Sequence, residues 1–171
     1  MKKRILSLLL ALMMVLSLIP TLAFAAGEDN SKVTVYFSLS ANGKYKNGTS
    51  GKTLAYVPVT VEYFDLDDYG LGKYTRADAG EQPTVLHLFI KMLEQEYLNS
   101  GKLTVGGDAL TVSGAAGSMF MTKFWGHDQN LTYYVNHVYP IMSGSTGATA
   151  DWIILKDGDV VDVAMFDDWS F

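Results

Sequence analysis

Alternating apolar and polar residues predict two strands near the start of the chain. Apolar side chains occupy every second position within residues 31–41 and again within 53–64, and this period of two is typical of strands with one buried face. Residues 42–52 between them contain Asn-Gly twice, which indicates a loop. We therefore expect a long antiparallel hairpin. Pro58 has no backbone N–H to donate, so its strand is expected to have a free edge.

The hydrophobic period lengthens to that of a helix within residues 83–98. Leu86, Phe89 and Leu93 recur at spacings of three and four residues, which predicts an amphipathic helix. His87 falls opposite this apolar stripe and is therefore expected to be exposed to solvent.

Residues 65–82, which precede this helix, show no clear period. A connection of this length is typically functional or mobile. The carboxylates of Asp65, Asp67 and Asp68 are oxygen ligands of the kind that calcium prefers, but their spacing does not follow a dedicated calcium loop. No metal site is predicted from them.

The rest of the chain returns to short strands. Apolar and aromatic residues mark segments at 103–112, 119–125, 131–139, 152–155 and 160–166. The gap between the two aromatic-rich segments has the size of a hairpin loop, and Asp157-Gly158 indicates a turn before the last strand. Two strands, a helix and further strands predict an α+β fold, a β-grasp-like (ubiquitin-like) roll in which one helix packs on a mixed, largely antiparallel sheet. Residues 32–171 are expected to form a single domain.

The first residues of the chain have the pattern of a secretory signal peptide, predicted to span residues 1–25. Basic residues at positions 2–4 precede an apolar run, and Ala23-Phe24-Ala25 supplies the small residues that a signal peptidase needs. Its removal would give a secreted, extracellular protein with a mobile leader at 26–31, whose association with the cell surface stays open. A retained membrane anchor is the alternative, which the shortness of the apolar run disfavours.

The charge of the exported chain narrows the choice of partners. The full chain has 13 basic and 18 acidic residues, and loss of the three basic residues at positions 2–4 changes its net charge from −5 to −8. Nucleic-acid binding requires a basic surface, so no nucleic-acid partner is expected. The chain has no cysteine, which excludes disulfides, thiol catalysis and thiolate metal sites.

An aromatic-rich region near the second predicted hairpin is the strongest candidate for a binding site. Aromatic rings combined with a few polar groups suit a planar ligand or a sugar. The candidate ligand-binding residues are Trp125, His127, Asp128, Tyr133, Tyr134 and Asn136. In the alternative interpretation Trp125 belongs to the core, while His127 and Asp128 are solvated turn residues.

Catalysis has little support in the sequence. Neither Gly-x-Ser-x-Gly nor His-Glu-x-x-His occurs, so an enzyme is not expected and no catalytic residue is named. His137 alternates with Val135 and Tyr139, and is interpreted as a buried or half-buried, hydrogen-bonded histidine.

Four elements, in order, resemble one family. They are Pro83-Thr84-Val85 at the helix start, Phe124-Trp125-Gly126-His127-Asp128, Tyr133-Tyr134-Val135-Asn136, and the closing turn Asp157-Gly158-Asp159. Together they are similar to the transcobalamin-like C-terminal domain of exported Gram-positive, especially clostridial, proteins, over roughly residues 33–166. The resemblance implies a β-grasp-like fold. In the animal namesake such a domain is one half of a clamp around cobalamin, so the resemblance also makes cobalamin or another corrinoid a candidate ligand.

Two hypotheses follow for the function. The first is an exported, non-catalytic module that holds a small planar ligand, of corrinoid type, against the aromatic region. The alternative is a protein- or glycan-interaction domain on the cell exterior, which uses the acidic 65–82 segment or a free sheet edge. A pocket shared by Trp125, Tyr134 and His127 would favour the first, and a flat aromatic patch the second.

Overall fold

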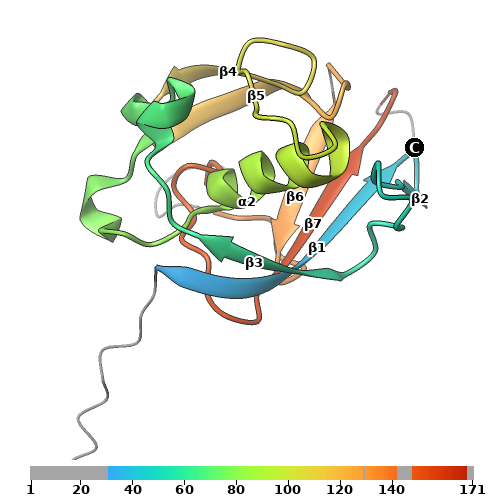
Figure 1. Ribbon diagram of the computed structural model, residues 1–171, viewed down its shortest axis with the longest axis horizontal. Coiled ribbons are helices and arrows are strands. Elements are labelled where there is room, and N and C mark those ends of the chain that lie inside the picture. Colours follow the sequence, from blue (N-terminus) through green and yellow to red (C-terminus); the bar gives the residue numbers. More distant parts are fainter. Residues whose placement is uncertain (1–30, 129, 142–147, 169–171) are drawn as a thin grey trace, which may run out of the picture.

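The computed structural model describes residues 31–128, 130–141 and 148–168. The predicted signal peptide, and all but the last residue of the predicted leader, lie outside these ranges. Within them the fold is α+β, with one α-helix, a mixed sheet and a second small sheet (Figure 1). No helix among these residues combines the length and the apolar character needed to cross a membrane.

The mixed sheet is organised around two parallel strands. Its members are β1 (Lys32–Ala41), β2 (Lys44–Tyr45), β3 (Val57–Glu62), β6 (Leu131–Val135) and β7 (Val160–Met165). β1 pairs with β7 in parallel, β2 and β3 pair antiparallel with β1, and β6 pairs antiparallel with β7. The first and last strands of the described chain are therefore neighbours at the centre of the sheet.

The first predicted hairpin is confirmed. β1 and β3 pair from Lys32 opposite Glu62 to Phe37 opposite Val57. In the described part of the chain β3 has β1 as its only strand partner, so Pro58 lies in an edge strand, as its missing N–H predicts.

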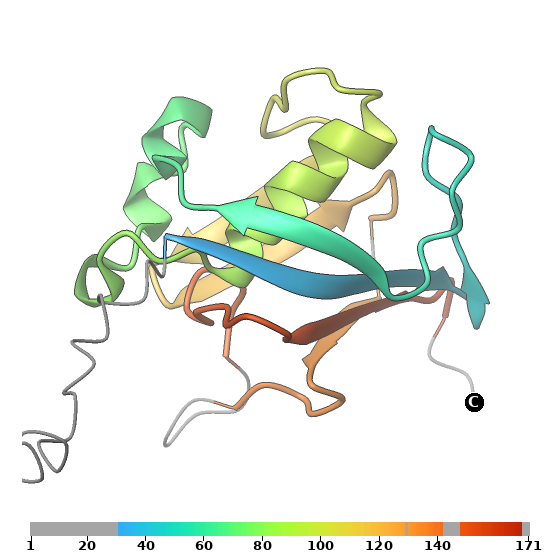
Figure 2. The same cartoon turned by 60° about the horizontal axis from the view of Figure 1, so that its bottom comes forward.

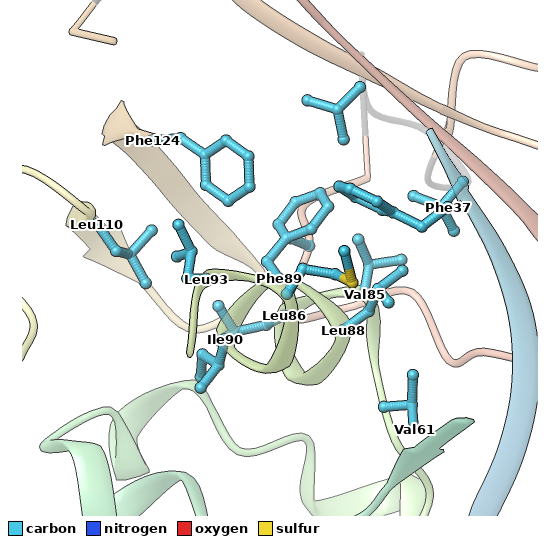
Figure 3. Packing of buried hydrophobic residues seen from close by; sticks show 14 of the residues in the cluster. Phe37, Val61, Val85, Leu86, Leu88, Phe89, Ile90, Leu93, Leu110 and Phe124 are labelled. Carbon is cyan, nitrogen blue, oxygen red and sulfur yellow. The ribbon is translucent and has the colours of Figure 1, made fainter. Parts of the chain in front are cut away.

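The predicted helix is also confirmed, but it is buried more completely than its pattern suggests. α2 (Val85–Met92) continues into a π-helical turn, η4 (Leu93–Tyr97). Seven of the eight residues of α2 are buried: Val85, Leu86, His87, Leu88, Phe89, Ile90 and Met92. Side chains from both sheets and from the 65–82 segment belong to the same core cluster, so α2 has apolar neighbours on most sides. Figure 3 shows this packing around Phe89.

The predicted pairing of residues 119–125 with 131–139 is wrong. β5 (Ser118–Phe124) pairs instead with β4 (Leu110–Ala115), and the two form the separate small sheet. Trp125 and Gly126 have φ angles of 57° and 75°, and the backbones of Phe124 and His127 exchange two hydrogen bonds across them. The reversal thus takes two residues instead of the expected five, and β6 joins the main sheet.

Two other segments also differ from prediction. Residues 152–155 form no strand, and Ile154 makes only an isolated bridge with Thr84. The 65–82 segment contains three short 3₁₀ turns, η1 (Leu66–Tyr69), η2 (Gly72–Tyr74) and η3 (Ala77–Ala79), whose Leu66 and Tyr74 are buried. This segment is therefore packed against the core and is not a free acidic loop.

We expect Phe89→Ala to destabilise the protein by about 3–5 kcal/mol, because it empties the core position that joins the two sheets. The Phe89 ring is fully buried and lies 5.0 Å from that of Phe124 and 5.5 Å from that of Tyr133. Chemical denaturation measures the change. Phe120→Ala is the control, since Phe120 is 65% exposed and its loss should change stability by less than about 0.5 kcal/mol. Equal effects of the two variants would contradict this account of the core.

Candidate functional site

The six residues predicted to bind a ligand do not form one site, and Trp125 is the clearest departure. Its side chain is only 7% exposed, and its ring packs 5.4 Å from the ring of Tyr97 and 6.0 Å from that of Phe124. The indole belongs to the core, as the alternative interpretation has it, and cannot act as an exposed platform.

His127 and Asp128 lie at the corner where the chain passes from the small sheet to the main sheet. His127 is half-buried, and its Nε2 is 3.0 Å from the backbone oxygen of Phe166. It lines a hollow of about 240 Å³ with Met121 and Lys123. Asp128 is exposed. The histidine thus ties the start of β6 to the end of β7.

Tyr133 and Tyr134 lie on opposite faces of β6, since successive side chains of a strand alternate. The Tyr133 ring packs on Phe89, and its hydroxyl donates a 2.8 Å hydrogen bond to the backbone oxygen of Ala148. Burial raises the pKa of Tyr133 well above its usual range. Tyr134 faces away from the helix, so the two phenols cannot contact one ligand from the same side.

Asn136 serves a turn. Its Nδ2 donates to Asp159 and its Oδ1 accepts from the backbone N–H of Val160, both at 2.9 Å. With φ angles of 52° and 63°, Asn136 and His137 link Val135 to Val138, which exchange backbone hydrogen bonds. Asp159 also accepts from the backbone N–H of Lys156 at 2.8 Å, so the predicted turn at 157–159 is confirmed.

A hollow of about 350 Å³ lies where β5 and β6 separate. Its wall includes Met119, Met121, Leu131, Tyr133 and Tyr139. The hollow exists because β5 and β6 do not pair with each other. If they formed the predicted hairpin, their pairing would close this hollow. Of the six predicted ligand-binding residues, only Tyr133 lines this hollow; Trp125 and His127 do not.

The face of the main sheet away from α2 carries a second group of aromatic side chains. Figure 2 shows α2 on one side of the sheet only. Alternation places Tyr36 and Ser38 of β1, Asp162 of β7 and Tyr134 of β6 on the opposite side, which we call the open face. Four tyrosines here are substantially exposed: Tyr36 (43%), Tyr45 (48%), Tyr56 (46%) and Tyr139 (51%).

Asp162 lies at the centre of the open face. In the register of the sheet it is opposite both Ser38 and Tyr134. The Ser38 hydroxyl donates to Asp162 Oδ1, and His137 Nδ1 donates to Oδ2 at 2.9 Å. The Asp162 side chain is 20% exposed, so this carboxylate is accessible while it is held in place by two neighbours.

The aromatic rings of the open face form two clusters. Tyr56 lies edge-on to Tyr45 at 6.2 Å and to His137 at 6.4 Å, while Tyr134 lies edge-on to Tyr139 at 6.2 Å. A hydrogen bond with Tyr45, followed by the negative charge of Asp162, raises the pKa of Tyr56. The field of the carboxylate therefore reaches this ring.

The structure confirms that His137 is hydrogen-bonded but corrects its predicted burial. Its side chain is hydrogen-bonded, as expected, but it is 64% exposed instead of buried or half-buried. The reason is that β6 ends at Val135, so the alternation that was expected to bury His137 stops before it.

His87 was expected to be exposed, and this prediction is wrong, since only 2% of the residue is exposed. Its Nδ1 accepts from the backbone N–H of Thr84 at 3.0 Å, and its Nε2 lies 3.1 Å from the backbone oxygen of Phe64. Because Nδ1 faces a donor, Nε2 must carry the proton and the ring is neutral. Its role is to cap α2 and to tie the end of β3 to the helix.

Burial lowers the pKa of His87 to about 4, so we expect stability to fall in acid. Above pH ~6.5 the ring is neutral in both states, and no pH dependence results. Between about pH 6.5 and pH 4 the imidazole is protonated in the unfolded chain but neutral in the folded protein. The free energy of unfolding therefore falls by about 3 kcal/mol across this range. Denaturation of the wild type and of His87→Asn across this range should show a larger loss in the wild type, because carboxylates such as Glu62 and Asp78, whose pKa is lowered by a basic neighbour, lose stabilisation in both proteins. The same slope in both proteins would place the titration elsewhere.

The described residues contain no group of three or more His, Asp or Glu side chains arranged to hold a metal ion. The Asp65 carboxylate instead accepts from the backbone N–H of Asp67 at 2.9 Å and caps η1. In comparisons with known proteins, no family model matches the chain, and neither a curated protein nor a solved structure matches it.

Proposed function

We propose that the protein is an exported, non-catalytic binding module that recognises an extracellular protein or glycan through the open face of its sheet. The observation that carries this proposal is the set of exposed tyrosines around the half-buried carboxylate of Asp162. Tyrosine supplies a large, rigid contact area with a polar end at low entropic cost. Such a surface suits recognition and requires no reacting group.

The shape of this surface favours a macromolecule over an enclosed small ligand. Four hollows among the described residues have neither Tyr36, Tyr45, Tyr56 nor Asp162 in their walls, and Tyr139 is the one exposed tyrosine of the open face that lines any of these four. A largely flat aromatic patch is typical of an interaction surface, whereas small ligands occupy concave sites.

The β-grasp-like interpretation is part of the proposal. It is supported by the parallel neighbours β1 and β7 and by a single helix packed on one face of the sheet. Membership of the transcobalamin-like family rests on the four sequence elements alone, and export rests on the predicted signal peptide.

We expect the double variant Tyr36→Ala/Tyr134→Ala to lose binding on a glycan array or on an array of extracellular-type peptides. The loss should be tenfold or more, since two aromatic contacts together contribute about 1.4 kcal/mol or more. Phe120→Ala is the matched control, because it removes an exposed ring from the small sheet. Absence of binding on both arrays, or equal loss in the control, would refute the open face as the recognition surface.

A corrinoid or another planar ligand is a second candidate, favoured by the hollow between β5 and β6. Its volume of about 350 Å³ lies at the lower end for ligand pockets. This alternative predicts a visible-absorbance change when the protein is titrated with cobalamin or cobinamide. Met121→Trp, which fills the hollow, should abolish that change. No change at ~100 μM, enough to reveal affinities near −5 kcal/mol, would eliminate it.

A further inference from the structure

We propose that the open face binds the cationic side chain of a partner protein, an arginine or a lysine, seated on Asp162 between the two aromatic clusters. This inference rests on the proposed function and names the chemistry of its partner. Three features support it: the open acceptor positions of the Asp162 carboxylate, the aromatic rings beside this carboxylate, and the net charge of the chain.

The Asp162 carboxylate has more hydrogen-bond acceptor positions than the two that Ser38 and His137 occupy. Its two oxygens accept one hydrogen bond each, from Ser38 and His137, whereas an ionised carboxylate has about four acceptor positions. Among the described residues no lysine or arginine nitrogen lies within 4.0 Å of it. Among these residues His137, which pairs with Oδ2, is the one basic side chain in contact with it, so an incoming cation would add a second charged partner at the acceptor positions that Ser38 and His137 leave open.

The rings around Asp162 favour the same ligand charge. The face of an aromatic ring carries negative potential and attracts guanidinium and ammonium groups. Tyr56 lies on one side of the carboxylate with Tyr45 and His137, and Tyr134 lies on the other side with Tyr139. A cation at Asp162 could therefore gain both an ion pair and ring contacts, which a neutral sugar could not.

The net charge favours a basic partner over a neutral one. The chain has a net charge of −5, and −8 once the predicted signal peptide is removed. Asp157 and Asp159 add carboxylates at the turn that precedes β7. Long-range attraction would steer a basic segment toward this protein, and Asp162 would supply the specific contact.

A peptide with three arginines separated by Gly-Ser, and the same peptide with citrulline in their place, test the inference. Citrulline keeps the shape of arginine and removes its charge. Binding to the full protein is measured by calorimetry and by the shifts of tyrosine ring signals in NMR spectra. We expect the arginine peptide to bind at least about tenfold more tightly than the citrulline peptide, with shifts at Tyr56 and Tyr134.

Two variants with the same net charge separate the site from general attraction. Asp162→Asn should weaken arginine-peptide binding about tenfold while keeping an acceptor for Ser38. Asp68→Asn removes one charge from exposed residue 68, away from the open face, and should change affinity less than twofold. If Asp162→Asn does not fold, Tyr56→Ala replaces it, because this variant removes an exposed ring of the open face. Its loss of arginine-peptide affinity is then compared with that of Asp68→Asn.

Equal loss in Asp162→Asn and Asp68→Asn would overturn the inference, as would equal affinity for the two peptides. Failure of the proposed function has a different signature. If the arginine peptide does not bind but array binding still depends on Tyr36 and Tyr134, the cation inference alone falls. If both assays are negative, the open face is not a recognition surface.

Discussion

The parallel pairing of β1 with β7 is the constraint on which the rest of the structure depends. It joins the two ends of the described chain at the centre of the sheet, from Tyr36 opposite Val160 to Ala41 opposite Met165. Parallel neighbours cannot be joined by a tight turn, so the intervening chain must cross over the sheet. That crossover contains α2, which covers one face of the sheet and leaves the other open. The hydrogen bond from Ser38 to Asp162 crosses the same strand pair on the open side, so the central pairing also positions the proposed binding carboxylate.

Local patterns predicted those elements whose partners are near in sequence. The β1–β3 hairpin follows from alternation and two Asn-Gly pairs, and α2 follows from its apolar stripe. The burial of His87 could not be inferred in this way. A helix with one covered face would expose residue 87, but the rings of Tyr63 and Phe64, just after β3, pack 5.2 Å and 4.7 Å from the imidazole. Only the folded structure shows that Phe64 and Thr84 supply the two hydrogen-bond partners that make a buried imidazole acceptable.

The predicted site failed for a related reason. Hairpin-like spacing around Gly126 predicts that residues 119–125 pair with 131–139, but strand pairing depends on competition among all available strands. β4 supplies a closer partner for β5, and β7 takes β6. Trp125 then lies in a two-residue turn that packs against the core. Tyr134 instead lies on the open face, together with tyrosines from β1, from β2 and from the residue that precedes β3. The alternation of Tyr36 and Ser38 in the first strand marked a polar face, but nothing in the sequence shows that Asp162 would lie beside it.

The distribution of aromatic residues connects the fold to its proposed use. Rings that stabilise the core, such as Phe89, Phe124 and Trp125, gather on the helix side, where burial removes apolar surface from water. The tyrosines of the open face contribute little burial, since four of them are more than 40% exposed. Four of the tyrosine rings are positioned in pairs, through the edge-on contacts of Tyr56 with Tyr45 and of Tyr134 with Tyr139. Side chains that are exposed, ordered by mutual contact and grouped around one carboxylate present a preorganised surface, which lowers the entropic cost of binding.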